Sequence, residues 1–530
     1  MESVFLFTEI QVIVVLMVAS AVAVLTRYVK IPYTVALVLA GLVLALQTDI
    51  QIEMTPELVL FIFAPPLLFE AALHLDLRKL RADLIPIATM AVPGVLISAF
   101  VIGSVLAFTG ILSFPVGLLF GALISATDPV AVVATFRAVG APKRLTTIVE
   151  GESLFNDGTA VVLFGIVLGL VQHGEFSLAE GVYDFLRESI GGMAVGALLG
   201  YTSAQLIARI DDYLIETTIT TIAAYASFAL AQYLHFSGVL GVVAAGLVMG
   251  SLGPRGMSPT TRIVLYNFWE YFAFLANSVV FILIGLNVDS TSLQRFFMPA
   301  VFAVFAVLAS RAINVYGLGA ILRYFKPDLP RSYLHVLYWG GLRGALSLAL
   351  VLSLPFAVQE RTELLAMTFG VVLFTLLIQA TTIPSLLKRL GMTQAGATPI
   401  EYERLQGKLL ASRASRRHLD RLYSEGALMP YAWETVKKEL DANEKMLSQA
   451  TYDMLTDHPD LHDKIVSLAR VDTLRAQRAA LSNLAHEGLL SGDALAQLTA
   501  ELDEAIQSPE AGSLALNADE EDVEDEASSI

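Results

Sequence analysis

The chain alternates long apolar stretches with short polar breaks through its first 390 residues. A helix that crosses a bilayer needs about 20 apolar residues, and most of these stretches are of about that length. The pattern predicts thirteen spans, at residues 3–26, 31–47, 56–75, 84–109, 114–136, 145–172, 189–208, 215–234, 237–252, 264–287, 297–322, 332–357 and 363–387. We therefore expect an all-α polytopic membrane protein with about 13 transmembrane helices over residues 1–390.

Positively charged residues favour one side of these spans. The loops after odd-numbered spans hold 14 Lys and Arg residues, and the loops after even-numbered spans hold three. Cytoplasmic loops of membrane proteins are enriched in Lys and Arg. The bias predicts that the N-terminus lies outside and the C-terminus in the cytoplasm, and it supports an odd number of spans.

The sequence after residue 390 has a different character. Leu405, Leu409 and Leu410 illustrate an apolar spacing of three and four that is typical of amphipathic helices. We expect a helical cytoplasmic regulatory domain over residues 391–508. Residues 509–530 form an acidic tail that we expect to be disordered, with seven carboxylates in the eight positions 519–526. We favour a solvated tail that aids solubility over a segment that binds a regulatory partner. The sequence does not identify such a partner.

Composition and charge exclude several classes of protein. Hydrophobic residues make up 55% of the chain, charged residues 16%, and the mean hydropathy is +0.65. Soluble proteins carry about 25% charged residues, so a cytosolic enzyme is excluded. The net charge of −16 divides into −3 for residues 1–390 and −13 for the remainder, so neither part resembles a nucleic-acid-binding protein. The absence of cysteine excludes disulfides and thiolate metal sites.

Nine Asp, Glu and Arg residues lie inside the predicted spans beyond the first two positions of each, where each costs at least about 2.5–3.5 kcal/mol. They are Glu9, Glu70, Asp128, Glu150, Glu152, Asp157, Glu270, Arg311 and Arg343. The excess of carboxylates favours a pathway for cations or protons over an anion carrier. We place Glu9 and Glu270 near span ends, and we expect Arg311 to reach the interface or to pair with Glu270.

The fifth span contains Asp128 followed by Pro129 in an otherwise apolar run. Proline removes a main-chain donor and clashes with the preceding turn, so we expect the helix to break at residues 125–129. A break in a buried helix frees carbonyl groups that can face a cation. Thr127 and Asp128 then offer oxygen ligands, although Asp128 could instead cap the second half of the helix.

The sixth span places three polar residues on one helical face, because Ser153, Asn156 and Asp157 follow one another at i, i+3 and i+4. Glu152 points partly aside. Removal from water favours the neutral form of a carboxyl group, so a proton and a metal ion would compete for Asp157. The other interpretation is a polar stripe that serves neighbouring helices.

The twelfth span carries three glycines within residues 340–344, around Arg343. Glycine weakens a helix, so a second interruption is expected here. If spans 1–6 and 8–13 are inverted repeats, both interruptions fall in the fifth helix of a repeat, which is typical of transport sites. Arg343 needs an acidic partner. We favour Glu152 for this structural pair and Glu70 as an accessory ligand or gate, with the reverse assignment left open.

These motifs together resemble the sodium/proton exchanger family, specifically the bacterial and archaeal antiporters related to animal plasma-membrane exchangers. The resemblance is carried by Ala126-Thr-Asp-Pro129, Gly151-Glu-Ser-Leu-Phe-Asn-Asp157, Phe268-Trp-Glu with Asn277-Ser, and Gly340-Gly-Leu-Arg-Gly344. It covers essentially all of residues 1–390 and does not extend to the tail.

The resemblance implies a function and a site. It implies an antiporter of the plasma membrane, which in a bacterium is the inner membrane. This antiporter would exchange Na⁺ or Li⁺ for H⁺ by alternating access. Asp157 would be the carboxylate that carries the ion and the proton. The other implied ligands are Asp128, Ser153, Glu70 and the carbonyl group of Thr127. Asn156 matches a position where asparagine is associated with electroneutral exchange. A homodimer is also implied.

Two other transport functions fit the same residues. Oxygen ligands alone do not distinguish Na⁺ from K⁺, so a potassium/proton antiporter is the first alternative, followed by a gated cation channel. A membrane-tethered sensor is disfavoured because the tail has no nucleotide or phosphotransfer motif. We expect the bilayer as a partner, no nucleic acid, and no cofactor besides the transported Na⁺ and H⁺, because the eight histidines lack the paired spacing of a metal centre.

Overall fold

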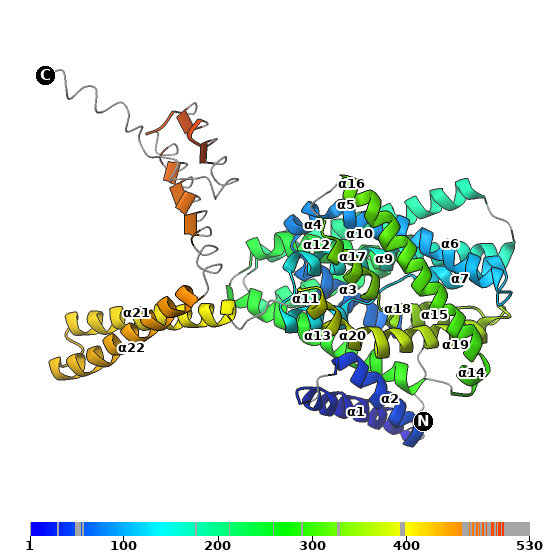
Figure 1. Cartoon of the computed structure of the whole chain (residues 1–530), viewed down its shortest axis with the longest axis horizontal. Coiled ribbons are helices and arrows are strands. Elements are labelled where there is room, and N and C mark those ends of the chain that lie inside the picture. Colours follow the sequence, from blue (N-terminus) through cyan, green and yellow to red (C-terminus); the bar gives the residue numbers. More distant parts are fainter. Residues whose placement is uncertain are drawn as a thin grey trace. The chain divides into compact units, whose positions relative to one another are not determined.

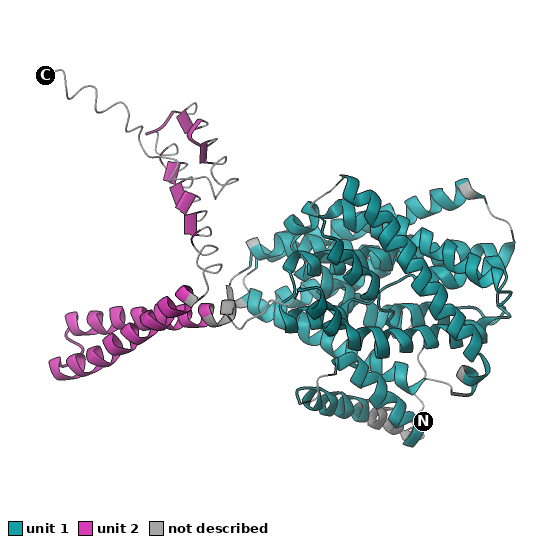
Figure 2. Cartoon of the chain, in the orientation of Figure 1, with its two compact units in different colours: residues 1–394 teal, residues 395–530 magenta. Residues whose placement is uncertain are grey.

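The computed structural model describes most of the chain. The described residues are 2–28, 31–47, 55, 58–174, 177–210, 212–257, 259–287, 290–325, 329–392 and 398–457, with scattered positions between 466 and 502. The predicted acidic tail, residues 509–530, lies outside them, as does the side chain of Glu9. The chain divides into two compact units, residues 1–394 and 395–530 (Figure 2).

The first unit is built from helices, and its described residues contain no strand (Figure 1). Its first half comprises α1 (Glu2–Leu25), α2 (Tyr33–Gln47), η1 (Leu58–Phe63), α3 (Ala64–His74), α4 (Leu77–Ala82), α5 (Leu84–Ala91), α6 (Pro93–Phe108), α7 (Phe114–Ile124), α8 (Val130–Val139), α9 (Lys143–His173) and α10 (Leu178–Ile207). Its second half comprises α11 (Tyr213–Tyr233), α12 (Gly238–Leu252), η2 (Gly253–Arg255), α13 (Pro259–Leu286), α14 (Ser290–Arg295), α15 (Phe297–Ala312), η3 (Ile313–Leu318), α16 (Gly319–Phe325), α17 (Arg331–Trp339), α18 (Ala345–Leu352), α19 (Arg361–Phe374), η4 (Thr375–Ala380) and α20 (Thr381–Arg389).

Each of the thirteen predicted spans contains helix, which confirms the all-α membrane fold. Seven helices in the described residues are long and apolar enough to cross a membrane by themselves. They are Leu84–Phe108, Lys143–His173, Ala179–Ile207, Tyr213–Tyr233, Thr261–Leu286, Phe297–Tyr324 and Arg361–Arg389. Of the other six predicted spans, the first lies on the continuous helix α1 and the remaining five contain shorter or interrupted helices. The total of thirteen crossings stays a prediction.

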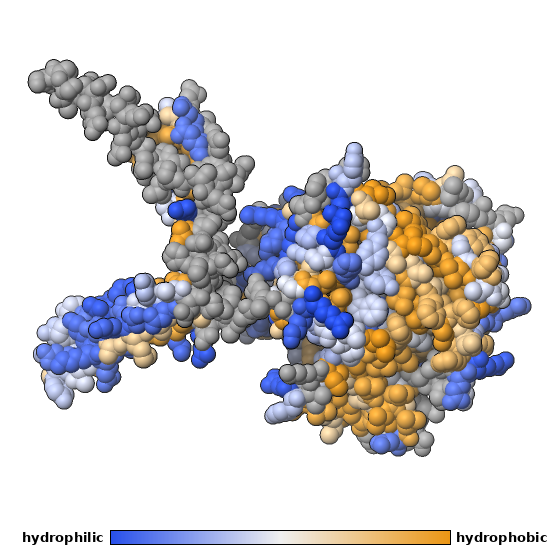
Figure 3. Space-filling model, viewed as in Figure 1, coloured by the Kyte–Doolittle hydropathy of each residue, from blue (hydrophilic) through white to orange (hydrophobic). Residues whose placement is uncertain are grey.

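The surface of the first unit is that of a protein embedded in lipid. Figure 3 shows large hydrophobic areas on the visible face of this unit. Phe100, Leu198 and Phe305 are among the many large apolar side chains that are more than half exposed. Apolar patches of this extent are found on soluble monomers only at interaction sites, whereas lipid tails cover them at no cost.

Close helix packing forms the interior of this unit. The densest contact joins α10 and α12, where a Cβ atom on Gly196 would collide with the carbonyl oxygen of Gly241. Gly41 of α2 and Gly285 of α13 approach one another as closely, because a Cβ atom on either glycine would collide with the backbone of the other helix. Small residues allow two backbones to approach, which is the usual way in which membrane helices gain packing contacts.

Two helices are interrupted at the places that the sequence predicts. The fifth span ends as α7 at Ile124 and resumes as α8 at Val130, and the twelfth ends as α17 at Trp339 and resumes as α18 at Ala345. The two breaks touch, because the main-chain N–H of Asp128 donates to the carbonyl group of Leu342 at 2.9 Å. Both predicted interruptions are therefore confirmed, and they meet in the interior.

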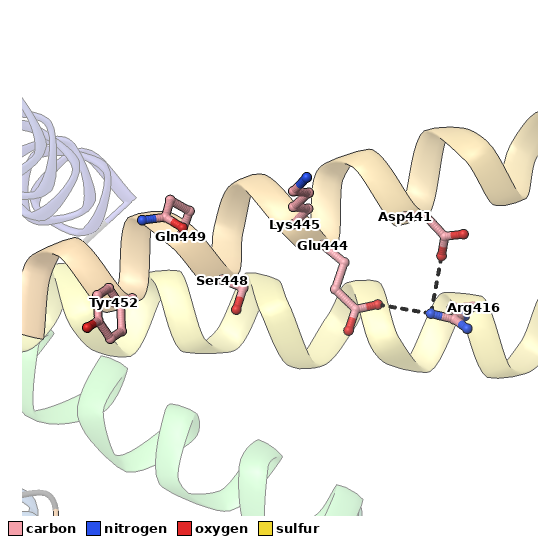
Figure 4. A pocket seen from close by; sticks show the side chains of 7 residues that line it. All are labelled: Arg416, Asp441, Glu444, Lys445, Ser448, Gln449 and Tyr452. Atoms are coloured by element: carbon pink, nitrogen blue, oxygen red, sulfur yellow. Dashed lines mark ion pairs between the residues drawn. The ribbon is translucent and has the colours of Figure 1, made fainter.

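The second unit contains a helical hairpin of α21 (Thr398–Ser424) and α22 (Pro430–Asp457). Ion pairs tie the two helices together, with Arg413 and Glu444 at 2.9 Å and Arg416 and Asp441 at 3.2 Å. A shallow groove beside Arg416 is lined by charged and polar side chains, and Figure 4 shows this arginine reaching two carboxylates of α22. These charged side chains are partly exposed to solvent and pair with one another, as on an ordinary solvated surface.

Candidate functional site

A cavity of about 120 Å³ lies inside the first unit, where α3, α9, α13 and α18 surround the break between α7 and α8. Its lining includes five of the six residues for which the sequence predicts ion or proton binding, namely Glu70, Thr127, Asp128, Ser153 and Asp157. The sixth, Asn156, contacts Thr127 without lining the cavity. Residues that are up to 87 positions apart in the sequence are thus brought to one small space.

Side chains of α9 satisfy the backbone that the first break exposes. The main-chain N–H of Thr127 donates to Asn156 Oδ1 at 3.2 Å, and Asn156 Nδ2 donates to Thr127 Oγ1 at 2.6 Å. The Ser153 hydroxyl donates to the Thr127 carbonyl oxygen. An amide can donate and accept in this way, whereas an ionised carboxylate only accepts. Asn156 therefore holds the break in place, and its predicted contact with the ion stays a prediction.

Asp128 uses one carboxylate oxygen to cap α8. Its Oδ1 accepts the main-chain N–H of Val130 at 3.0 Å, which is the capping interaction that the sequence left open. Its Oδ2 faces Gly344 in the second break, where a Cβ atom would collide with it. Asp128 thus caps a half-helix and also lines the cavity, so the two interpretations of this residue are compatible.

Asp157 presents an unpaired oxygen to the cavity. It lies on α9 one turn beyond Ser153, and its Oδ1 is buried without a hydrogen-bond partner among the described residues. A buried carboxylate oxygen without a partner is costly, so the stable state has either a proton or a cation on this oxygen. The cavity is therefore suited to alternate occupation by the two.

Arg343 does not pair with Glu152, and this prediction is wrong. The Arg343 side chain is buried at 1% exposure, and its Nη1 donates to the carbonyl oxygens of Ser125 at 2.7 Å and Ala126 at 3.1 Å. These carbonyls lie just beyond Ile124, the last residue of α7, and have no helical partner because the helix stops there. A cation at the C-terminal end of a helix also complements the helix dipole, so the broken helix itself is the partner of this arginine.

Glu152 pairs instead with Arg311, which the sequence placed at the interface or beside Glu270. Arg311 Nη1 lies 2.5 Å from Glu152 Oε1, and the two side chains are 8% and 3% exposed. Arg311 Nε and Nη2 also donate to the Leu337 carbonyl oxygen near the end of α17. The ion pair therefore links α9 to the second interrupted helix through α15.

Ionisable residues that the sequence did not assign to the site lie near Glu70. His74 Nδ1 lies 3.2 Å from Glu70 Oε1, and the His74 ring contacts Tyr266 of α13. Glu150, which also lines the cavity, lies 3.5 Å from Arg137 Nη2. Glu70 is therefore in contact with His74, and its role as an ion ligand or gate stays a prediction.

Three residues of this region were missed by sequence reasoning for different reasons. Arg311 carried the signal of a charge at membrane depth, but its partner is 159 positions away. Glu150 is also a charge at membrane depth, but the sequence analysis did not assign it to the cavity. Ser347 gave no signal, because a serine in an apolar helix is common when it bonds to its own backbone.

Comparison with protein families finds a match over residues 13–389 to the family described as sodium/hydrogen exchanger, transmembrane. A Na⁺/H⁺ antiporter of Aphanothece halophytica, ApNhaP, is 39% identical over 81% of this chain and 84% of its own length. The Na⁺/H⁺ antiporter NhaG of Bacillus atrophaeus is 36% identical over 93% of this chain and 95% of its own length. The second relative extends across the helical hairpin as well as the membrane unit.

Among solved structures, the sodium proton antiporter MjNhaP1 of Methanocaldococcus jannaschii has a similar fold. The TM-score is 0.63 at 22% sequence identity, and the match covers 73% of this chain and 99% of that protein. At this identity the likeness concerns the fold alone. It agrees with the all-helical first unit described above.

Proposed function

The chain belongs to the sodium/hydrogen exchanger family, and from this premise we propose how it works as a Na⁺/H⁺ antiporter. As a multi-pass membrane protein that exchanges ions, it is a secondary transporter and not an enzyme. The observation that carries the proposed site is the unpartnered Asp157 oxygen in a small cavity between two interrupted helices.

Exchange follows from competition at this oxygen. A proton neutralises Asp157, and Na⁺ or Li⁺ replaces the proton with help from the oxygens of Thr127, Asp128 and Ser153. Hard monovalent cations prefer such oxygen ligands, and the interrupted helix supplies them without a lipid-facing polar group. A lower pH therefore weakens Na⁺ binding, and a higher pH strengthens it. Glu70 acts as an accessory ligand or gate at the same cavity.

We infer one-for-one, electroneutral exchange by alternating access. One carboxylate binds either one proton or one monovalent cation, so the loaded site has the same charge in both directions. Asn156 supports this inference because it offers no second titratable group beside Asp157. An exchange of this kind has a rate that does not depend on the membrane potential, and it serves pH and sodium homeostasis.

The placement of the transporter completes the proposal. Membership of the antiporter family supports a plasma membrane, in a bacterium the inner membrane. The distribution of Lys and Arg supports an N-terminus outside and a C-terminus in the cytoplasm. We propose that the protein works as a homodimer in the bilayer, that it needs no cofactor besides the transported ions, and that residues 391–508 regulate transport.

Proton flux in proteoliposomes tests this function. The purified protein is reconstituted with a pH-sensitive dye inside, and flux is started with Na⁺, Li⁺ or K⁺. Na⁺ and Li⁺ should start the flux, and Asp157→Asn should abolish it, because an amide neither exchanges the proton nor neutralises the cation. Asp184→Asn on α10, which does not line the cavity, is the matched control.

The outcomes separate the alternatives. Flux started by K⁺ and not by Na⁺ would make the protein a potassium/proton antiporter on the same scaffold. Cation currents that ignore the pH gradient would indicate a channel. Normal exchange by Asp157→Asn would refute the proposed site, and a rate that changes with an imposed membrane potential would refute electroneutrality.

A further inference from the structure

Ser347 carries a buried hydroxyl group that takes no part in the hydrogen bonds of the two helix breaks. It is the third residue of α18, directly after the second interruption, and it is 0% exposed. It lines the same cavity as Asp128, Ser153 and Asp157. Its Oγ has no hydrogen-bond partner among the described residues.

Several other buried hydroxyl groups of this protein bond to the main chain of their own helix, and those that lack a partner among the described residues, on Thr34, Ser189 and Ser412, do not line the cavity. Thr135 donates to the carbonyl oxygen of Ala131 at 2.9 Å, and Thr368 donates to that of Leu364 at 2.7 Å. Ser227 on α11 does the same with Ala223. Bonding to the carbonyl four residues earlier is the usual solution for Ser and Thr inside helices.

Ser347 cannot form this bond, because the helix is interrupted just before it. The residue four positions earlier is Arg343, which precedes the start of α18, so no helical carbonyl lies behind the hydroxyl. A buried hydroxyl without a partner loses its hydrogen bonds to water and gains none in return, and alanine would avoid that cost. The hydroxyl therefore requires a partner from the contents of the cavity.

The second unpartnered oxygen of the cavity is Asp157 Oδ1. Of the buried polar side-chain atoms without a partner in the described residues, only Asp157 Oδ1 and Ser347 Oγ belong to residues that line this cavity. The cavity has room for a few water molecules, each of which takes about 30 Å³ in the liquid. Two unsatisfied oxygens on residues that line so small a cavity are suited to binding a cation.

We propose that Ser347 supplies a further oxygen ligand for the transported cation, so that both interrupted helices contribute to its binding. This inference rests on the proposed function. A hydroxyl group adds a ligand without adding charge, so it leaves the one-for-one balance with the proton unchanged. Ser347 therefore acts on the affinity for the cation and not on the number of ions exchanged.

Replacement of this hydroxyl tests the proposal in the full-length protein. In proteoliposomes at high pH, where protons compete least, Ser347→Ala should raise the apparent KM for Na⁺ about 3- to 10-fold, with maximal rate within about twofold of wild type. Ser347→Cys should do the same, because it keeps a side chain of similar size but replaces a hard oxygen with a soft sulfur, which suits Na⁺ poorly.

The matched controls are Ser227→Ala and Ser227→Cys, which change an equally buried hydroxyl that bonds to its own helix. Their KM for Na⁺ should stay within about twofold of wild type. A wild-type KM in either Ser347 variant would overturn the proposal, since Ser347 would then only fill space. A shifted pH profile with unchanged KM would overturn it too, because the hydroxyl would then serve the proton.

A binding measurement separates this inference from the proposed function. Na⁺ should raise the melting temperature of the purified wild-type protein, and this shift should be smaller in Ser347→Ala. If wild type exchanges Na⁺ and Asp157→Asn does not, while Ser347→Ala shows both a wild-type KM and a wild-type shift, the ligand role of Ser347 alone fails. If wild type shows no Na⁺-dependent flux, the proposed function fails first.

Discussion

The two interrupted helices meet at one cavity, yet their breaks are built from opposite chemistry. The break between α7 and α8 is rich in oxygen, because Thr127 and Asp128 stand there without a continuous helix. The break between α17 and α18 consists of glycines around Arg343. One break supplies ligands, and the other supplies space and positive charge. The residues at each helix break are therefore set by the groups that pack against the break from other helices.

The glycines of the second break provide room for groups from other helices. A Cβ atom on Gly341 would lie 2.8 Å from Arg311 Nε, and one on Gly344 would collide with the Asp128 carboxylate. Neither glycine has a positive φ angle, so backbone strain does not explain them. Close approach is the reason for glycine at both positions.

The two buried arginines serve the two breaks in parallel but with different partners. Arg343 binds carbonyl oxygens at the end of α7, and Arg311 binds the Leu337 carbonyl oxygen near the end of α17. Of these two arginines, only Arg311 also has a carboxylate of the described residues at ion-pair distance, namely that of Glu152. Arg311 thus forms a buried ion pair, whereas the Arg343 guanidinium is held by carbonyl groups at a helix end.

The largest expected effect distinguishes these two arginines. Arg311→Ala should lower the free energy of unfolding by about 3–5 kcal/mol, because it leaves the Glu152 carboxylate buried and unpaired. Adding Glu152→Gln should restore part of this loss. Arg343→Ala should also destabilise, but Glu152→Gln should not rescue it. Thermal unfolding of the purified variants measures both, and equal rescue of the two arginine variants would contradict the assignment.

An intermediate effect is expected from Gly344→Ala. The added methyl group occupies the position of the Asp128 carboxylate, and overpacking of this kind costs about 1–3 kcal/mol. Displacement of Asp128 should lower Na⁺-dependent proton flux about 10-fold at subsaturating Na⁺. Gly165→Ala on α9, where nothing lies within 4 Å of the new atom, is the control. Unchanged flux in Gly344→Ala would show that Asp128 does not need its observed position.

The smallest effect is expected at the edge of the cavity, away from both breaks. The pair of Arg137 and Glu150 spans 3.5 Å, and the arginine side chain is 68% exposed. Arg137→Ala should therefore change the free energy of unfolding by less than about 1 kcal/mol, and less again at high salt. Chemical or thermal unfolding at two salt concentrations measures this. A loss as large as that of Arg311→Ala would remove the distinction between buried and exposed pairs.

Local sequence features predicted the architecture of the membrane unit well. Pro129 after Asp128 and the glycines at 340–344 predicted both interruptions, because proline and glycine act on the backbone within a few residues. Helical periodicity placed Ser153, Asn156 and Asp157 on one face of α9, and Ser153 and Asp157 line the cavity. The helical character of the segment after residue 398 followed from its apolar spacing in the same way.

Partners across the fold could not be predicted in this way. Arg343 and Glu152 had complementary charges, yet the nearest partner of Glu152 is Arg311, and Arg343 binds carbonyl groups that carry no formal charge. Sequence alone weighs side-chain charges and has no means of counting the main-chain groups that a break leaves unsatisfied. The unpartnered hydroxyl of Ser347 also became visible only once its neighbours were known.

The sequence by itself therefore determined which segments are helices, where two of them break, and which residues are too polar to face lipid. These properties depend on interactions within one or two helical turns. The tertiary structure alone decided that Arg311 pairs with Glu152, that Arg343 closes the end of α7, and that Ser347 faces the same cavity as Asp157. These choices depend on the distances between packed helices, which no local pattern contains.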